Sequence, residues 1–180
     1  PVWNEAVALM IQQRFSHGGL GVARRRARHL LESDASKLGE AISELGEAAW
    51  QDVEHNRFGS ALELVELRED ALTRLGAGPS DPRWGECMLV RSGALVHLDD
   101  HVAGLEVARQ AEVAASRYGW RMVLPRALGQ QAVIALQAGD QAEAHARWDE
   151  AIRLCSSRDV QSRGRLLWYL AEFHRRAGNL

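Results

Sequence analysis

Five residues that favour sharp turns recur along this chain, at intervals of 38, 43, 40 and 39 residues. All five are glycine, asparagine or aspartate: Gly18, Asn56, Asp99, Gly139 and Gly178. These residue types tolerate the left-handed backbone conformation in which a helix ends and the chain reverses. A repeat of about forty residues is typical of stacked helical units, each too small to bury its apolar face alone. The spacing therefore predicts a helical-repeat fold.

Small residues flank these turns at fixed distances. Seven residues before the turns stand Ile11, Ala49, Ser92, Ala132 and Ala171, and five residues after the first four turns stand Ala23, Ala61, Gly104 and Ala144. Apart from Ile11, these side chains are small enough to let two antiparallel helices approach closely. The pattern predicts a pair of helices around each turn.

The turns divide the chain into predicted helices. The first helix of each pair is expected at 3–15, 36–54, 83–97, 125–138 and 160–176, and the second at 20–32, 58–75, 102–117 and 141–156. Asp81 before Pro82 has the form of an N-cap followed by proline at the first helical position. Sustained alternation of polar and apolar residues is absent from the sequence, so we expect an all-α fold. The loop from Gly76 to Pro82 is too short for a domain linker, and we expect one domain over residues 1–180.

The segment from Leu128-Gly129 to Ala151 resembles a tetratricopeptide (TPR) repeat. It has Leu-Gly in the first helix, a turn at Gly139, and Ala144 and Trp148 where the family has alanine and phenylalanine. Residues 56–64, Asn-Arg-Phe-Gly-Ser-Ala-Leu-Glu-Leu, look like the turn and second-helix start of the same family. The resemblance implies a right-handed α-α superhelix, a TPR-like solenoid of about four and a half antiparallel helix pairs.

The repeat length narrows the resemblance. The common period of the family is about 34 residues, and here it is about forty. The longer repeat is similar to the helical arrays of large bacterial transcriptional regulators and signal-transduction ATPases. Armadillo-like and other α-solenoids stay open as alternatives.

Motifs for catalysis are absent from the sequence, which has no glycine-rich phosphate loop, no His-Glu-x-x-His and no Gly-x-Ser-x-Gly. His97, Asp99 and His101 have a metal-like spacing, but Asp99 falls in a turn that would separate the two histidines. Cys87 and Cys155 stand among apolar residues and are expected to be small buried residues. We therefore expect no enzyme, no cofactor and no metal site.

The overall charge is nearly balanced, with a net charge of −2 at pH 7. Because duplex-DNA-binding domains usually carry a basic excess, direct nucleic-acid binding is disfavoured. The run Arg24-Arg25-Arg26-Ala27-Arg28 is a local exception that a solvated helix face explains, with a phosphate contact as the alternative. No apolar run approaches the roughly 18 residues of a membrane span, and we expect a cytoplasmic protein.

The resemblance to TPR domains implies that the first helices line a concave partner-binding groove. Counted from the small residue of each first helix, the positions one, four and five after it and six before it should point into this groove. These positions give Trp50 and Glu54, then Glu86, Val96 and His97, then Arg126, Val133 and Gln137, and finally Arg165, Glu172, Arg175 and Arg176.

The expected function is binding. We expect a non-catalytic protein- or peptide-interaction or ligand-sensing module of a bacterial regulatory protein, such as a transcriptional regulator, within a longer chain. The alternative is a free-standing TPR scaffold that assembles a complex. Arg126 and Arg165 occupy equivalent places in successive repeats, which favours a partner with an acidic segment. The apolar last helix, with Leu166 and Leu167, predicts self-association through an open C-terminal end.

Overall fold

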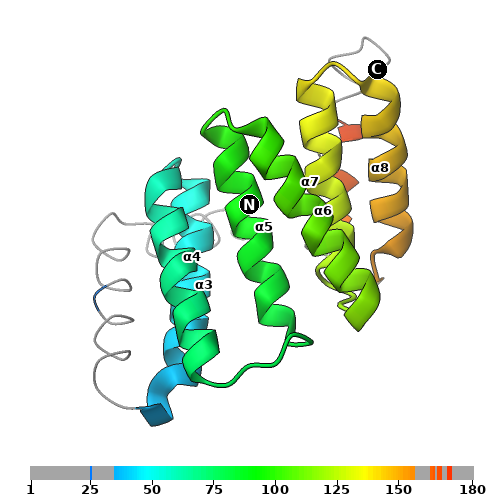
Figure 1. The fold of residues 1–180 in the computed structure, drawn as a ribbon. Coiled ribbons are helices and arrows are strands. Elements are labelled where there is room, and N and C mark those ends of the chain that lie inside the picture. The colour runs from blue at the N-terminus through cyan, green and yellow to red at the C-terminus, as the bar shows by residue number, and fades with distance from the viewer. Residues whose placement is uncertain (1–24, 26–34, 157–162, 165, 168–169, 172–180) are drawn as a thin grey trace, which may run out of the picture. The chain divides into compact units, whose positions relative to one another are not determined.

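The structure is a computed structural model, and it describes residues 25, 35–156, 163–164, 166–167 and 170–171. Within these residues the fold is all-α (Figure 1). A short 3-10 helix, η1 (Ala35–Lys37), leads directly into the first of six α-helices. The helices are α3 (Leu38–Glu54), α4 (Phe58–Arg74), α5 (Pro82–His97), α6 (His101–Tyr118), α7 (Leu124–Gln137) and α8 (Gln141–Leu154).

These helices form three sequential pairs, α3 with α4, α5 with α6, and α7 with α8. Their bounds lie within two residues of those predicted from the sequence. The predicted helices at 3–15 and 20–32 lie outside the described residues, apart from Arg25, which is helical and exposed. Of the last predicted helix, 160–176, the described residues are helical. The all-α fold and the helix pairs are therefore confirmed over the described part of the chain.

The turn inside each pair has the same backbone geometry. Asn56, Asp99 and Gly139 have φ angles of 59°, 69° and 84°, in the left-handed region that the sequence predicted for them. In each turn, the next residue's N–H reaches back to a carbonyl oxygen five residues earlier, as from Asp140 to Ala135 at 2.9 Å. This bonding satisfies carbonyl groups at the end of the first helix. Gly18 and Gly178 lie outside the described residues.

Aspartates begin three of the helices. Asp81 caps α5 by accepting from the Arg83 N–H at 3.0 Å, and Pro82 follows at the first helical position, as predicted. Asp100 and Asp140 cap α6 and α8 in the same way, each accepting a backbone N–H three residues ahead. These caps satisfy N–H groups that have no partner within the helix. In the α5–α6 and α7–α8 pairs, the first helix is thus followed by a left-handed turn residue, and an aspartate directly after that residue caps the second helix.

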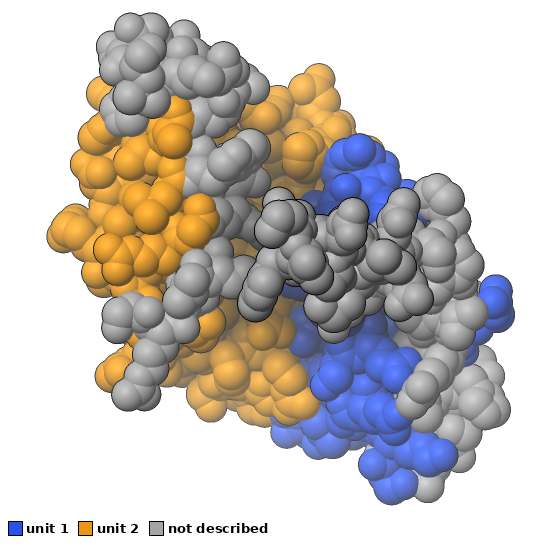
Figure 2. Space-filling view, turned by 180° about the vertical axis from the view of Figure 1, so that it is seen from behind, with its two compact units in different colours: residues 1–77 blue, residues 78–180 orange. Residues whose placement is uncertain are grey.

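The chain divides into two compact units, residues 1–77 and 78–180 (Figure 2). The boundary falls in the loop from Gly76 to Pro82. The single-domain assignment over 1–180 stays a prediction. In the first unit α3 packs against α4 around fully buried Ile42, Leu45, Leu64 and Leu72.

A buried arginine crosses this first pair. Arg68 on α4 is only 5 % exposed, and its Nε donates to the Ile42 carbonyl oxygen on α3 at 3.0 Å. Gly46 provides the space, because a Cβ built there would lie 2.6 Å from Arg68 Cζ. Leu45-Gly46 holds the same place in its repeat as Leu128-Gly129, a match that was not among the predicted ones.

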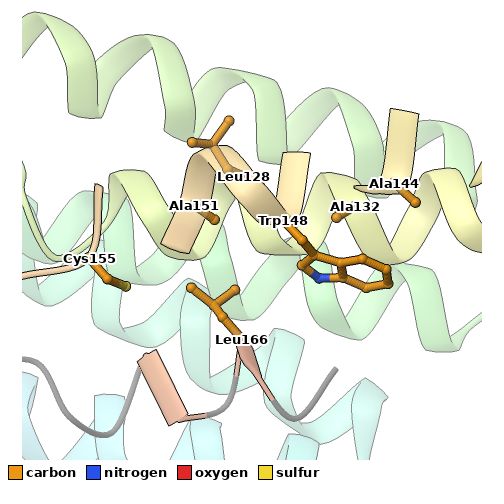
Figure 3. Packing of buried hydrophobic residues seen from close by; sticks show 7 residues of the cluster. All are labelled: Leu128, Ala132, Ala144, Trp148, Ala151, Cys155 and Leu166. Atoms are coloured by element: carbon orange, nitrogen blue, oxygen red, sulfur yellow. The ribbon is translucent and has the colours of Figure 1, made fainter. Parts of the chain in front are cut away.

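In the second unit α7 contacts α5, α6 and α8, and α5 packs along α6. Trp148 is 1 % exposed and lies in the α7–α8 core, where Figure 3 shows it beside Ala132 and Ala144. Leu166 packs onto the same core, against Gly129, where a Cβ would lie only 2.5 Å from Leu166 Cδ2. The residue that stands in place of the family's phenylalanine is therefore a core residue here.

The predicted small residues are buried within the helix pairs. They are Ala49 and Ala61 in the first pair, Ser92 and Gly104 in the second, and Ala132 and Ala144 in the third. Ala171, the last small residue of this register, is instead exposed. Cys87 and Cys155 are buried, as expected, and neither forms a disulfide.

Candidate binding surface

The predicted groove positions are divided between the two units. Trp50 and Glu54 lie on α3 in the first unit, where Trp50 is half-buried and Glu54 is exposed. The second unit carries Glu86 and His97 on α5, and Arg126, Val133 and Gln137 on α7. Arg165, Glu172, Arg175 and Arg176 lie outside the described residues. The candidate surface therefore consists of the predicted positions on α5 and α7, two helices that contact each other within one unit.

The predicted positions on α5 and α7 are half-buried along the helices and exposed at the helix ends. We call them the α5–α7 face. Glu86 and Arg126 take equivalent places, six residues before the small residue of each helix, and both are half-buried. Val133 is half-buried one residue after Ala132. Opposite charges therefore stand at the same register position on two adjacent helices, and both groups already have interactions in the structure.

The exposed ends of this face are explained by helix geometry. His97 and Gln137 are the last residues of α5 and α7, as Glu54 is the last residue of α3. A terminal helical residue is exposed whether or not it belongs to a binding face. The exposure of these three residues therefore follows from their place at the helix ends and is no test of the predicted groove.

Val96 is not a groove residue, so that expectation was wrong. It is 7 % exposed, and its Cγ2 would lie 2.6 Å from a Cβ on Gly104 of α6. Val96 therefore packs against Gly104 of α6, where the two helices approach closely. Counting four residues from Ser92 leads to the side of α5 that faces its own partner helix.

Gln130 joins the two first helices. Its Nε2 donates to the Leu89 carbonyl oxygen on α5 at 2.7 Å. Gly93 makes room for the amide, since a Cβ there would lie 3.3 Å from Gln130 Nε2. This residue was not predicted from the sequence. Its place four after Arg126 and three before Val133, on the same helical face, was the available signal.

A polar network on the other side of α7 was also not predicted. Gln131, only 3 % exposed, donates from Nε2 to Glu112 Oε2 on α6 at 2.7 Å. Glu112 Oε1 lies 3.4 Å from Arg147 Nη1 on α8, and Arg147 Nε donates to Glu143 Oε1 at 2.7 Å. The hydrogen bond to Glu143 raises the pKa of the Arg147 guanidinium, with Glu112 adding to the effect. The network links three helices.

The metal-like spacing does not form a metal centre. Asp99 adopts the left-handed turn conformation between the end of α5 at His97 and the start of α6 at His101, as predicted. Asp99 Oδ1 lies 3.0 Å from His101 Nε2. Over residues 35–156 and the few described beyond them, no group of three or more His, Cys, Asp or Glu side chains is placed to hold a metal ion.

Comparison with known proteins does not assign the chain to a family. No family model matches it, and no curated protein matches it. In the part of the chain that the structure describes, none of the helices is both long enough and apolar enough to cross a membrane.

Proposed function

We propose that the chain is a TPR-like helical repeat that binds a protein or peptide segment through its first helices. The observation that carries the proposal is the repetition itself. Three pairs share one turn geometry and bury small residues at the same register positions, so equivalent side chains recur at equivalent places. Repeats of this kind build extended binding surfaces because each unit presents the same face. Right-handed superhelical stacking is part of the proposal.

Within this surface, the α5–α7 face is formed by two first helices that contact each other. It offers Glu86 and Arg126, the half-buried Val133, and the exposed His97 and Gln137. Mixed charge around a partly apolar centre suits a peptide better than a nucleic acid, which would need a basic surface. The biological setting that we propose is a bacterial regulatory protein in the cytoplasm, acting without catalysis.

A peptide-display selection tests this proposal. A random peptide library is selected on the immobilised chain, and enriched peptides are assayed by fluorescence anisotropy against variants Glu86→Lys and Arg126→Glu. Asp149→Lys and Arg153→Glu on α8 are the controls, because both residues are exposed and lie outside the α5–α7 face. We expect the α5 and α7 variants to weaken binding by about tenfold and the α8 variants to bind normally. Enriched peptides that bind all four variants equally would refute the α5–α7 face.

A further inference from the structure

The outward face of α6 carries exposed arginines that form no ion pair with a carboxylate within the described part of the chain. Arg109, Val113 and Arg117 follow one another at intervals of four, so they lie along one side of the helix. All three are exposed, with Val113 at 66 %. The opposite side of α6 is buried through Ala108, Ala111 and Ala115, which pack towards the neighbouring helices. Figure 1 shows α6 between α5 and the α7–α8 pair.

The same kind of surface continues into the turn after α6. Gly119 ends the helix with a φ of 71°, and Arg121 and Met122 follow, both exposed, with Met122 at 52 %. Trp120 between them is buried, and its Nε1 donates to the Ser80 carbonyl oxygen at 2.7 Å. The buried Trp120 ring and its hydrogen bond fix the turn in a conformation that leaves Arg121 and Met122 exposed. We call Arg109, Val113, Arg117, Arg121 and Met122 the α6 patch.

Two acidic side chains of α6 have polar partners outside the patch. Glu112 binds Gln131 and Arg147, and Glu106 accepts from Gln110 at 3.0 Å. Arg117 lies over the Tyr118 ring, with Cζ 5.3 Å from its centroid, which stacks the guanidinium without neutralising it. Over the described residues, none of the three patch arginines forms an ion pair with a carboxylate. By contrast, Arg147 of the same unit has two such partners.

We propose that the α6 patch binds an acidic, amphipathic segment of a partner protein, separately from the α5–α7 face. Charge complementarity selects the carboxylates, because guanidinium groups bind them in two-pronged geometry. Val113 and Met122 select a partner that also has apolar side chains, since exposed apolar groups gain from being covered. A nucleic-acid backbone would satisfy the arginines and leave both apolar side chains in water. The net charge of −2 also disfavours nucleic acid.

The test uses the full chain and two labelled helical peptides in fluorescence anisotropy. The first peptide is an amphipathic helix with glutamates spaced four residues apart and leucines between them. The second peptide has lysine in place of every glutamate. A short DNA duplex is the third probe. The variant is Arg109→Glu with Arg117→Glu, and Arg153→Glu, an exposed arginine on α8, is the matched control. Circular dichroism confirms that each variant is folded.

We expect the glutamate peptide to bind, to weaken with added salt, and to lose about tenfold in affinity with the double variant. The control variant should bind as the parent does, and Val113→Ser should weaken binding without changing its salt dependence. No binding of the glutamate peptide, equal binding of the lysine peptide, or tighter binding of the duplex would each overturn the proposal. So would sedimentation showing that the patch is occupied by a second copy of this chain, with Arg109→Glu and Arg117→Glu dissociating it.

Discussion

Gly104 on α6 lies so close to Val96 on α5 that a Cβ at position 104 would stand 2.6 Å from Val96 Cγ2 and 3.2 Å from the Ser92 carbonyl oxygen. Ser92 Oγ donates to the Gly104 carbonyl oxygen at 2.8 Å across the same contact. The side chain of Val96 can turn, but the Ser92 backbone cannot move without shifting α5. We expect Gly104→Ala to lower the free energy of unfolding by about 1 kcal/mol, because overpacking outweighs the gain in helix propensity.

Gly59 on α4 is the matched control, since it is helical and a Cβ there would have no atom within 4 Å. Gly59→Ala should keep or raise stability by up to about 1 kcal/mol through helix propensity alone. Urea unfolding followed by circular dichroism measures both variants. If the two substitutions shift the midpoint in the same direction, the close approach of α5 and α6 is wrong.

Ala144 is the corresponding small residue on α8, where that helix packs against α7. It is fully buried beside Trp148 and Ala132. We expect Ala144→Leu to destabilise the fold by about 1–3 kcal/mol, because the larger side chain has no space. Ala146→Leu, on the exposed side of the same helix, should be nearly neutral. Equal thermal midpoints for the two variants would contradict the helix register.

The helix pairs could be predicted because few residue types suit their turns. Asn56, Asp99 and Gly139 stand where the backbone is left-handed, and glycine, asparagine and aspartate accept that conformation best. The small residues at the closest contacts follow from the same geometry, since two helices joined by a short turn must approach near it. Such features depend on local sequence, so a periodic search finds them.

The contacts between helices could not be predicted in this way. Gln131 donates a hydrogen bond to Glu112, nineteen residues away, and Arg147 on a third helix forms an ion pair with the same carboxylate. These pairings depend on how α6, α7 and α8 cross, which periodicity does not specify. Val96 was misplaced for a related reason. Counting around α5 assumes one buried side, whereas α5 contacts both α6 and α7.

Asp52 is the polar centre of the first pair. It is 1 % exposed, accepts from Arg57 Nε at 2.8 Å and also accepts from the Ser60 hydroxyl. Asp52→Ala should cost about 1–3 kcal/mol, because it removes the acceptor of both groups. Asp70→Ala is the control, since Asp70 is exposed and meets Arg74 only at 3.9 Å. Chemical denaturation of the two variants separates a buried pair from a surface pair, and similar losses would argue against the buried one.

Substitutions at two of the left-handed turn residues should change the stability of the chain in opposite directions. Asp99 has a φ of 69° and its side chain is 95 % exposed, so Asp99→Gly should stabilise the chain by up to about 1 kcal/mol. Gly139 has a φ of 84°, and Gly139→Ala should destabilise it by about 1 kcal/mol. Differential scanning calorimetry should show the transition rising in the first variant and falling in the second. Movement of both in one direction would be incompatible with these turn conformations.

Glu112 connects α6 to both α7 and α8, and its replacement separates charge from hydrogen bonding. Without it, the buried Gln131 amide keeps only a long contact of 3.4 Å to the Ala108 carbonyl oxygen. We expect Glu112→Ala to cost about 1–3 kcal/mol, because a buried donor loses its partner. Glu112→Gln should cost less, since its amide oxygen can still accept from Gln131 while the attraction to Arg147 is lost.

Salt distinguishes the two contributions of Glu112. The partly exposed contact between Glu112 and Arg147 is screened, so the cost of Glu112→Gln should shrink as salt rises. The remaining cost of Glu112→Ala should persist, because it comes from the desolvated Gln131 amide. Glu106→Ala, at an exposed position on the same helix, should cost little at any salt concentration. If Glu112→Ala and Glu106→Ala unfold at the same urea concentration, the three-helix network does not stabilise the fold.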